Sequence, residues 1–293
     1  MKTSKNTHLC PVCGSRKTRM YINAFNSHGA IVYNPENQFR YYRCEMCNAI
    51  FLIGIKPDAS YYQTYYNTYY RDEGTGTIGV SSLIVSYSDW VKRNLIEEYS
   101  SKAKGITLLD IGSGHGKFIE SLDKKQFNAT GLEIDKNLVT AYKKRGLNGL
   151  SGDFLKIDFG KRKFDIVTMW HVIEHVADAQ KLFKKVHALL SPHGLFIFST
   201  PNTDSIGLTK GKADWFHLDA PRHFVLYSET TVQYIAEKYG FEMLHIRNNY
   251  HDFPLDLFWS LRNVKNKWFY YLLYPFFKYT DRETLTYVLK KTS

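Results

Sequence analysis

Residues 107–118 constrain the fold of this chain more than any other stretch. An apolar run with β-branched ends, residues 106–111, predicts a buried strand. Three alternating glycines follow it, and residues 117–125 then predict a helix. Glycine is favoured where a chain turns sharply or where a ligand touches the backbone, because it has no Cβ. A strand, a glycine turn and a helix N-terminus in this order predict a nucleotide-type pocket at the carboxyl edge of a parallel sheet.

The residues around the glycines favour S-adenosylmethionine over a dinucleotide. In the dinucleotide pattern Gly-x-Gly-x-x-Gly, the third glycine comes one residue later than Gly116 does here. Asp110 precedes the first glycine by two residues, where its carboxylate would repel a pyrophosphate but pair with an ammonium. S-adenosylmethionine has an ammonium and no phosphate. Glu133 ends the next apolar run and suits ribose hydroxyls, while Asp153 and Phe154 suit the adenine amino group and ring.

Over about residues 82–247, these motifs resemble those of the class I S-adenosylmethionine-dependent methyltransferases. The matching segments are 110–116 (Asp-x-Gly-x-Gly-x-Gly), Glu133, 152–154 (Gly-Asp-Phe), 164–167 (Phe-Asp-Ile-Val) and 173–176 (Ile-Glu-His-Val). The resemblance implies an α/β fold with a doubly wound, seven-stranded Rossmann-like sheet, whose seventh strand inserts antiparallel beside the fifth. It also implies S-adenosylmethionine as cofactor, bound by Asp110, Gly112, Ser113, Gly114, Gly116, Glu133, Ile134, Asp153, Phe154 and Trp170.

The pattern along the chain predicts three parts. Residues 1–58 are expected to form a small zinc-binding β module, 59–82 a tyrosine-rich lid and linker, and 83–293 the methyltransferase domain. An insertion at 251–280 separates the last two strands of this domain. The alternating pattern predicts a helix at 83–99 and strands near 106–111, 129–134, 147–150, 164–169, 194–199, 240–247 and 284–290. The pattern Ser228-x-x-Thr231 predicts the N-cap of a helix after the fifth strand.

All four cysteines lie in the first 47 residues, as two Cys-x-x-Cys pairs: Cys10 with Cys13, and Cys44 with Cys47. Two such pairs place four thiolates for tetrahedral zinc, and four protein ligands predict a structural rather than a catalytic ion. The pairs are further apart than is usual, and we expect a hairpin near 34–37 to absorb the excess. The N-terminus has no signal-peptide pattern, which favours the cytoplasm and disfavours disulfides. A thioredoxin-like redox pair is disfavoured because neither pair lies in a βαβ pattern.

Paired tyrosines spaced by four residues occupy positions 61–70. On a helix they would form one stripe. This stripe either packs the module onto the main domain or acts as a lid that offers hydroxyls and ring faces to a substrate. In the second case Tyr65 and Tyr66 are substrate-binding residues.

The predicted catalytic residues follow the fourth strand of the sheet. Glu174 and His175 match a Glu-His pair that is common in related methyltransferases. In the ubiquinone-type O-methyltransferases, a carboxylate-x-x-Glu-His cluster binds a divalent metal. This chain has His171 in place of the first carboxylate. A His-Glu-His trio can also ligate a metal, so the sequence leaves open whether a catalytic metal is used.

A long loop after the fifth strand has further polar and aromatic residues where an acceptor would approach. We expect Trp215, His217 and Arg222 to bind the substrate and His223 to act as general base, with His175 as the second candidate. The segment around His223 resembles one in methyltransferases of surface-polysaccharide and deoxysugar pathways. In the sugar C-methyltransferases of that group, a Glu-His pair stands here and the histidine is the base; Arg222 replaces the glutamate. Alternatively, His223 only holds the loop through backbone hydrogen bonds.

Composition and charge favour an anionic partner. The formal net charge is +11, the pI is about 9.3, and aromatic residues make up 16% of the chain. The segment 253–279 is rich in aromatic and basic residues, which fits a packed helical pair, a dimer contact or a peripheral contact with an anionic membrane.

Three classes of function remain. The leading interpretation is an O-methyltransferase acting on a nucleotide-linked sugar or a surface-glycan intermediate, with sugar C-methylation as a variant. The second is an RNA base methyltransferase. It is disfavoured because the core lacks the Asn/Asp-Pro-Pro-aromatic motif and because the basic residues are scattered. The third, a non-catalytic scaffold, is disfavoured by the intact cofactor motifs. The sequence leaves open the identity of the acceptor and the oligomeric state.

Overall fold

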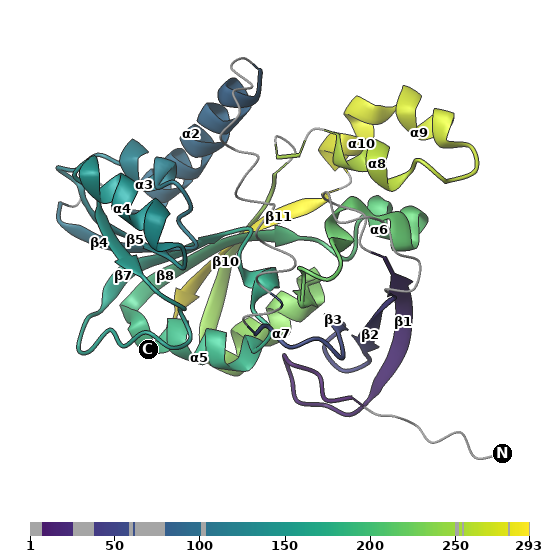
Figure 1. The fold of residues 1–293 in the computed structure, drawn as a ribbon, viewed down its shortest axis with the longest axis horizontal. Coiled ribbons are helices and arrows are strands. Elements are labelled where there is room, and N and C mark those ends of the chain that lie inside the picture. Colours follow the sequence, from purple (N-terminus) through teal and green to yellow (C-terminus); the bar gives the residue numbers. More distant parts are fainter. Residues whose placement is uncertain are drawn as a thin grey trace.

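The computed structural model describes residues 8–25, 38–58, 61, 80–100, 104–249, 252–253, 255–280 and 282–292. Tyr65, Tyr66 and the hairpin expected near 34–37 lie outside this range, so those predictions concern parts of the chain that are not described. Figure 1 shows the described elements around one large central sheet, with a smaller sheet beside it.

The large sheet has seven strands in the order β10-β11-β8-β7-β4-β5-β6. The strands are β4 (Ile106–Ile111), β5 (Phe127–Glu133), β6 (Asn148–Ser151), β7 (Phe164–Trp170), β8 (Leu190–Pro201), β10 (Phe241–Asn248) and β11 (Thr284–Lys291). Strands β4 to β8 pair in parallel, and β11 pairs antiparallel with both β8 and β10. The predicted fold class and the antiparallel placement of the last strand beside the fifth are therefore confirmed.

Helices cover both faces of this sheet. Their bounds are α2 (Val80–Ser100), α3 (Lys117–Ser121), α4 (Lys136–Lys144), α5 (Ala179–Leu189) and α7 (Glu229–Tyr239). Successive side chains of a strand point to opposite faces. In β4, Leu108 packs in the hydrophobic core with α2, α3 and α4, whereas Leu109 packs in the core with α5 and α7. The sheet is thus doubly wound. The helix predicted at 117–125 is shorter than expected, because Leu122 adopts an extended conformation and ends α3.

The small sheet joins the N-terminal module to the methyltransferase part of the chain. Its order is β1-β2-β3-β9, with β1 (Thr18–Ala24), β2 (Phe39–Cys44), β3 (Ile50–Leu52) and β9 (Val225–Leu226). Strand β9 comes from the long loop after β8 and pairs antiparallel with β3. The sequence did not predict this strand. Because of it, the module and that loop share one sheet and one hydrophobic core.

The first turn of α7 provides a second link between the module and the domain. Ser228 caps the helix in a capping box with Thr231, as the Ser-x-x-Thr pattern predicts. The Thr231 hydroxyl also donates to the carbonyl of Cys47 at 2.8 Å, and the Asn48 amide donates to the Ser228 hydroxyl at 3.2 Å. The cysteine-bearing turn therefore sits directly on the start of α7.

The insertion between β10 and β11 forms α8 (Asp256–Ser260), α9 (Lys267–Leu272) and α10 (Tyr274–Thr280). Figure 1 shows these helices at the upper right, beyond the end of β11 and next to α6 (Ile206–Gly211). Among the helices that the structure describes, none is long and apolar enough to cross a membrane.

Candidate functional site

The glycine turn between β4 and α3 has the backbone conformation that its sequence predicts. Gly112, Gly114 and Gly116 have φ angles of 73°, 52° and 73°, in the left-handed region that favours glycine. At Gly112 a Cβ would also lie 2.4 Å from a methyl carbon of Val172. At Gly114 no described atom lies within 4 Å of the position that a Cβ would take. The turn is therefore closely packed at Gly112 and open to a ligand at Gly114.

Two carboxylates lie at the carboxyl ends of β4 and β5, next to this turn. Asp110 is buried, its carboxylate accepts a hydrogen bond from the Thr168 hydroxyl at 2.7 Å, and burial raises its pKa to about 7. Glu133 is also buried and accepts hydrogen bonds from the backbone N–H groups of Gly114 (2.9 Å) and Ile134 (2.7 Å). A ligand ammonium beside Asp110 would favour the ionised carboxylate, since an opposite charge lowers a carboxyl pKa.

The remaining predicted cofactor residues surround the ends of β5, β6 and β7. Ile134 is 48% exposed, whereas Phe154 is buried against Phe159 and faces the core. The Asp153 carboxylate accepts from the N–H of Leu155 at 2.9 Å and pairs with Lys156 at 3.1 Å.

S-adenosylmethionine fits these residues. The indole N–H of Trp170 and the hydroxyl of Ser151 are buried and have no hydrogen-bond partner among the described residues. Such unpartnered polar atoms at the carboxyl edge of a sheet indicate a polar ligand. Together with Asp110, Glu133 and the exposed apolar surface of Ile134, they match its ammonium, ribose and adenine.

At the end of β7, His171 joins three segments of the chain. Its Nε2 lies 3.2 Å from Asp252, whose carboxylate also accepts from the Ser88 hydroxyl of α2 at 3.1 Å. Its Nδ1 lies 3.6 Å from the Glu174 carboxylate. Burial alone would lower the pKa of His171, but these two carboxylates raise it to about 9. His171 is thus charged at neutral pH and held between two acids.

The rings of His175 and His223 face each other beyond the carboxyl end of β7. This region and the loop at residues 212–224 are called the acceptor side below. Their ring centroids are 4.7 Å apart. The Nδ1 of His175 lies 3.0 Å from the Arg222 carbonyl, and the Nδ1 of His223 lies 2.7 Å from the His217 carbonyl. A carbonyl only accepts, so both Nδ1 atoms donate, and in the neutral rings Nε2 carries the lone pair. Burial and the neighbouring His175 lower the pKa of His223 to about 4, so His223 is neutral at pH 7.

Glu174 completes this group. It is buried, and burial alone would raise its pKa, but the ion pair with His171 and the charge of the nearby histidines lower it to about 2. Glu174, His175 and His223 each offer a ligand atom within 4.8 Å of the others. Among the described residues, His171 is not one of the ligands of this group, although its Nδ1 lies 3.6 Å from Glu174. That His171, Glu174 and His175 hold a metal stays a prediction.

The predicted substrate-binding residues of the loop contact other parts of the chain. Trp215 is fully buried, and its indole N–H donates to Glu283 at 2.7 Å. His217 is buried with its Nε2 3.0 Å from Asp256 of α8. Arg222 is buried and pairs with Asp219. In this conformation the three side chains hold the loop in place, and their contact with a substrate stays a prediction.

Sequence reasoning missed the acidic partners in these contacts. Asp252 and Asp256 lie in the insertion, Glu283 immediately precedes β11, and Asp219 lies within the loop. No local motif marks Asp252, Asp256 and Glu283, because each acquires its partner only through packing. Asp219 instead pairs with Arg222, three residues later in the same loop. The one available signal is that Asp252 and Asp256 are the only two acids in the aromatic insertion at 251–280.

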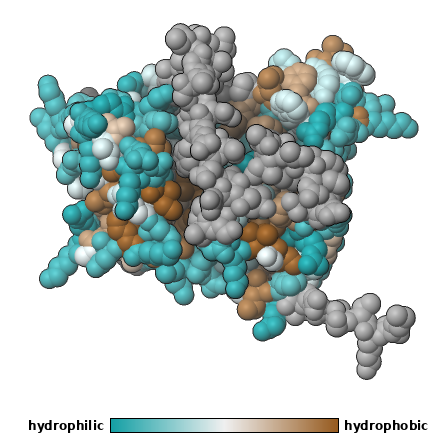
Figure 2. Space-filling model, in the orientation of Figure 1, coloured by the Kyte–Doolittle hydropathy of each residue, from teal (hydrophilic) through white to brown (hydrophobic). Residues whose placement is uncertain are grey.

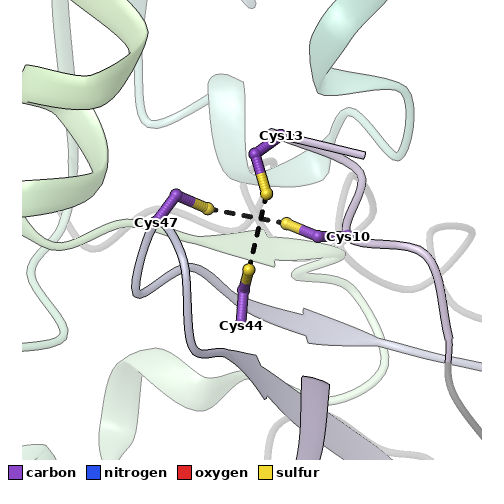
Figure 3. A group of neighbouring side chains, drawn as sticks. All are labelled: Cys10, Cys13, Cys44 and Cys47. Atoms are coloured by element: carbon purple, nitrogen blue, oxygen red, sulfur yellow. Dashed lines mark hydrogen bonds between the residues drawn. The ribbon is translucent and has the colours of Figure 1, made fainter. Parts of the chain in front are cut away.

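The four cysteines come together as one cluster at the edge of the small sheet. Figure 3 shows the four sulfur atoms pointing toward a common centre, with Cys10 opposite Cys47 and Cys13 opposite Cys44. The Sγ–Sγ distances of these pairs are 3.6 Å and 3.4 Å, and all four residues are free thiols. Sulfur atoms at about 2.3 Å from a tetrahedral zinc lie about 3.8 Å from one another. The donor set and its spacing therefore fit zinc.

Comparison with known proteins supports the assignment of the fold and the cofactor site. Residues 83–246, more than half of the chain, match a family model described as a methyltransferase domain. The chain belongs to this family. The match includes the glycine turn, Glu133 and the His171–His223 region, and it leaves out the cysteine module and the insertion. The chain thus contains a class I S-adenosylmethionine-dependent methyltransferase domain.

Individual relatives match less than half of the chain. Ubiquinone biosynthesis O-methyltransferase from Coxiella burnetii is 32% identical over 105 residues, covering 34% of this chain and 45% of that protein. The same-named protein from Paramagnetospirillum magneticum is 31% identical over 141 residues, covering 41% and 56%. The chain therefore spans about half the length of these curated relatives.

Solved structures share the fold at low sequence identity. Magnesium protoporphyrin IX methyltransferase from Synechocystis, solved with bound SAH, has a TM-score of 0.55 and 13% identity, covering 80% of this chain and all of that one. An S-adenosylmethionine-dependent methyltransferase from Mesorhizobium loti has a TM-score of 0.51 and 18% identity, covering 71% of this chain and all of that one.

We expect Glu133→Ala to weaken S-adenosylmethionine binding at least about tenfold. The carboxylate would accept hydrogen bonds from the ribose, each worth on the order of 1.5–3 kcal/mol because the acceptor is charged. Titration calorimetry measures the loss, and Glu133→Gln, which keeps an acceptor for the N–H of Gly114, should lose less. Unchanged affinity in a folded Glu133→Ala protein would contradict the assignment.

The charge on His171 should make stability depend on pH. Its pKa is raised from 6.5 to about 9 in the folded state, so its contribution is complete below pH 6.5 and is lost as pH rises through about 9. The contribution amounts to at most about 3 kcal/mol of unfolding free energy. His171→Asn tolerates the positive φ of 54° at this position but cannot carry the charge.

Urea unfolding of the wild type and of His171→Asn at several pH values tests this prediction. The difference between the two unfolding free energies should shrink as pH rises through about 9. A difference that stays constant from pH 6 to pH 10 would show that His171 is neutral in the folded protein.

Proposed function

We propose that the protein transfers the methyl group of S-adenosylmethionine to a hydroxyl of a saccharide, either nucleotide-linked or part of a surface-glycan intermediate. The observation that carries the proposal is the His175–His223 pair, in which backbone carbonyls bind both Nδ1 atoms and leave Nε2 as the basic atom. The names of the O-methyltransferase relatives support oxygen as the acceptor atom. The net charge of +11 and the sequence resemblance around His223 support an anionic saccharide.

The cofactor, when bound, supplies a methyl group already activated by the sulfonium, so alignment of the acceptor is most of the protein's task. Asp110 would hold the ammonium and Glu133 the ribose hydroxyls. These contacts would direct the methyl toward the carboxyl ends of β7 and β8, where the acceptor loop begins.

A hydroxyl acceptor must also lose its proton. His223 is neutral at pH 7 because its pKa is about 4, so its Nε2 is available to accept one. The resulting imidazolium would lie 3.8 Å from the Asp219 carboxylate and near the ionised Glu174. Both carboxylates favour this charged form and offset part of the effect of burial and of His175, which lower the pKa. The same pair of acids would hold His223 in orientation during the transfer.

The acceptor class is tested with radiolabelled S-adenosylmethionine and a panel of acceptors. Nucleotide-linked sugars, quinol-type phenols and RNA transcripts represent the alternatives. We expect label on the sugars at an oxygen atom, which mass spectrometry and NMR of the product locate. Transfer only to phenols or only to RNA would contradict the saccharide assignment.

With the acceptor so identified, we expect His223→Asn to lower kcat at least about 10²-fold while S-adenosylmethionine affinity stays unchanged. The asparagine amide can donate to the His217 carbonyl as Nδ1 does, so the loop keeps its support, but the amide cannot act as a base. His193→Asn is the matched control, because His193 is exposed, has a φ of 59° and lies away from the site. Near-normal turnover of His223→Asn would refute the base assignment.

We also propose that the cysteine cluster holds one structural zinc ion. The four sulfur atoms already converge, and four protein ligands leave no open position for catalysis. The ion would fix the turns at Cys10–Cys13 and Cys44–Cys47 relative to each other.

Elemental analysis of the purified protein should find about one zinc per chain. Cys44→Ser should lose the metal and unfold at a lower temperature, because structural zinc contributes directly to folding. Ser15→Ala, in the same turn as Cys13, should keep it. Absence of metal together with disulfides in the mass spectrum would contradict the proposal.

A further inference from the structure

The insertion exposes large apolar side chains to solvent. Trp268 is 74% exposed and Leu272 is 82% exposed. Phe269, Leu273, Phe276 and Tyr279 are exposed beside them, and these six residues are called the α9–α10 surface below. Figure 2 shows hydrophobic atoms over this part of the molecule at its upper right. Clustered exposed side chains of this size mark a surface that contacts something other than water.

This surface does not cover the central sheet. The insertion is anchored through α8, where Asp256 binds His217 and the Ser260 hydroxyl accepts from the N–H of Phe216 at 3.0 Å. Helices α9 and α10 chiefly contact each other. Ring contacts of Phe277 with Phe269 (6.1 Å) and Tyr270 (5.4 Å) hold the two helices together. The apolar side chains of α9 and α10 therefore extend into solvent from helices that α8 anchors to the rest of the chain.

The charge around this surface is positive. Residues 253–280 include four basic residues and one acid, Asp256, which is buried against His217. One of the four, Arg262, pairs with Asp214 at 2.9 Å. Lys265 is exposed between α8 and α9. Lys210 of α6 and Lys212 are exposed on the neighbouring segment, which packs against α8. Apolar and aromatic side chains bordered by cations match the acyl boundary and the anionic headgroups of a membrane surface.

We propose that the α9–α10 surface lies on an anionic lipid bilayer. Trp268, Phe269, Leu272 and Phe276 enter the boundary between headgroups and acyl chains, while Lys265 and the lysines of the neighbouring segment contact the headgroups. A purely apolar protein partner would account for the aromatic side chains but not for the surrounding cations.

Membrane contact would also position the acceptor loop. Helix α8 binds this loop at His217 and Phe216, so a protein resting on α9 and α10 holds the loop close to the lipid surface. Such an arrangement suits an acceptor that is itself attached to a lipid. This last step rests on the proposed function, whereas the membrane contact does not.

Co-sedimentation of the full chain with vesicles tests the contact without any methyl acceptor. Vesicles of phosphatidylcholine alone are compared with vesicles that also contain phosphatidylglycerol, at low and high salt. The wild type should bind the anionic vesicles, and binding should weaken with salt because the cations act through screened charge. Trp268→Gln combined with Leu272→Gln should lower the bound fraction at least about tenfold. Both side chains are exposed, so the variant should fold.

A matched control removes two exposed aromatic side chains elsewhere. Tyr87 and Trp90 of α2 are 44% and 48% exposed, and Tyr87→Gln combined with Trp90→Gln should bind vesicles as the wild type does. An equal loss in both variants, or no binding by the wild type, would overturn the proposal. Light scattering that shows a dimer dissociated by the α9–α10 variant, without vesicle binding, would assign the surface to a second copy of the chain and would also overturn it.

Discussion

The acceptor side depends on the hydrogen bonds that buried polar side chains make in the loop at residues 212–224. The Trp215 indole donates to Glu283 at the start of β11, His217 binds Asp256 of α8, and the Tyr41 hydroxyl of β2 donates to the His223 carbonyl at 2.8 Å. A buried polar group left without its partner costs about 1–3 kcal/mol. The loop can therefore adopt this conformation only when the large sheet, the insertion and the module are all assembled.

The cofactor side is built in a different way. The glycine turn, Asp110 and Glu133 belong to consecutive strand–turn–helix units, and their contacts are made at the carboxyl ends of neighbouring parallel strands. Backbone geometry chiefly determines which residues the glycine turn accepts, because positive φ angles and close packing exclude larger residues. The family model matches residues 83–246, which contain both the glycine turn and the loop, while the module and the insertion lie outside the matched residues.

The module is part of the acceptor side as well as a separate sequence unit. Strand β9 follows His223 by two residues and pairs with β3, and the Cys47 carbonyl accepts a hydrogen bond from Thr231 at the start of α7. A metal ion at the cysteine cluster would therefore stabilise the turn on which this part of the loop rests. The boundary at residue 58 stays a prediction, and the contacts of the module continue through β9.

The sequence by itself determined the parts that depend on near neighbours. Apolar periodicity placed the strands of the large sheet, the spacing of Asp110 and the glycines identified the cofactor turn, paired cysteines predicted the cluster, and Ser228 with Thr231 marked the start of α7. Tertiary structure alone decided the partners of His171, Trp215 and His217, the pairing of β9, and the convergence of Glu174, His175 and His223. The reason is physical: turn chemistry and periodicity act over a few residues, whereas Trp215 meets Glu283 from 68 positions away only because packing brings them together.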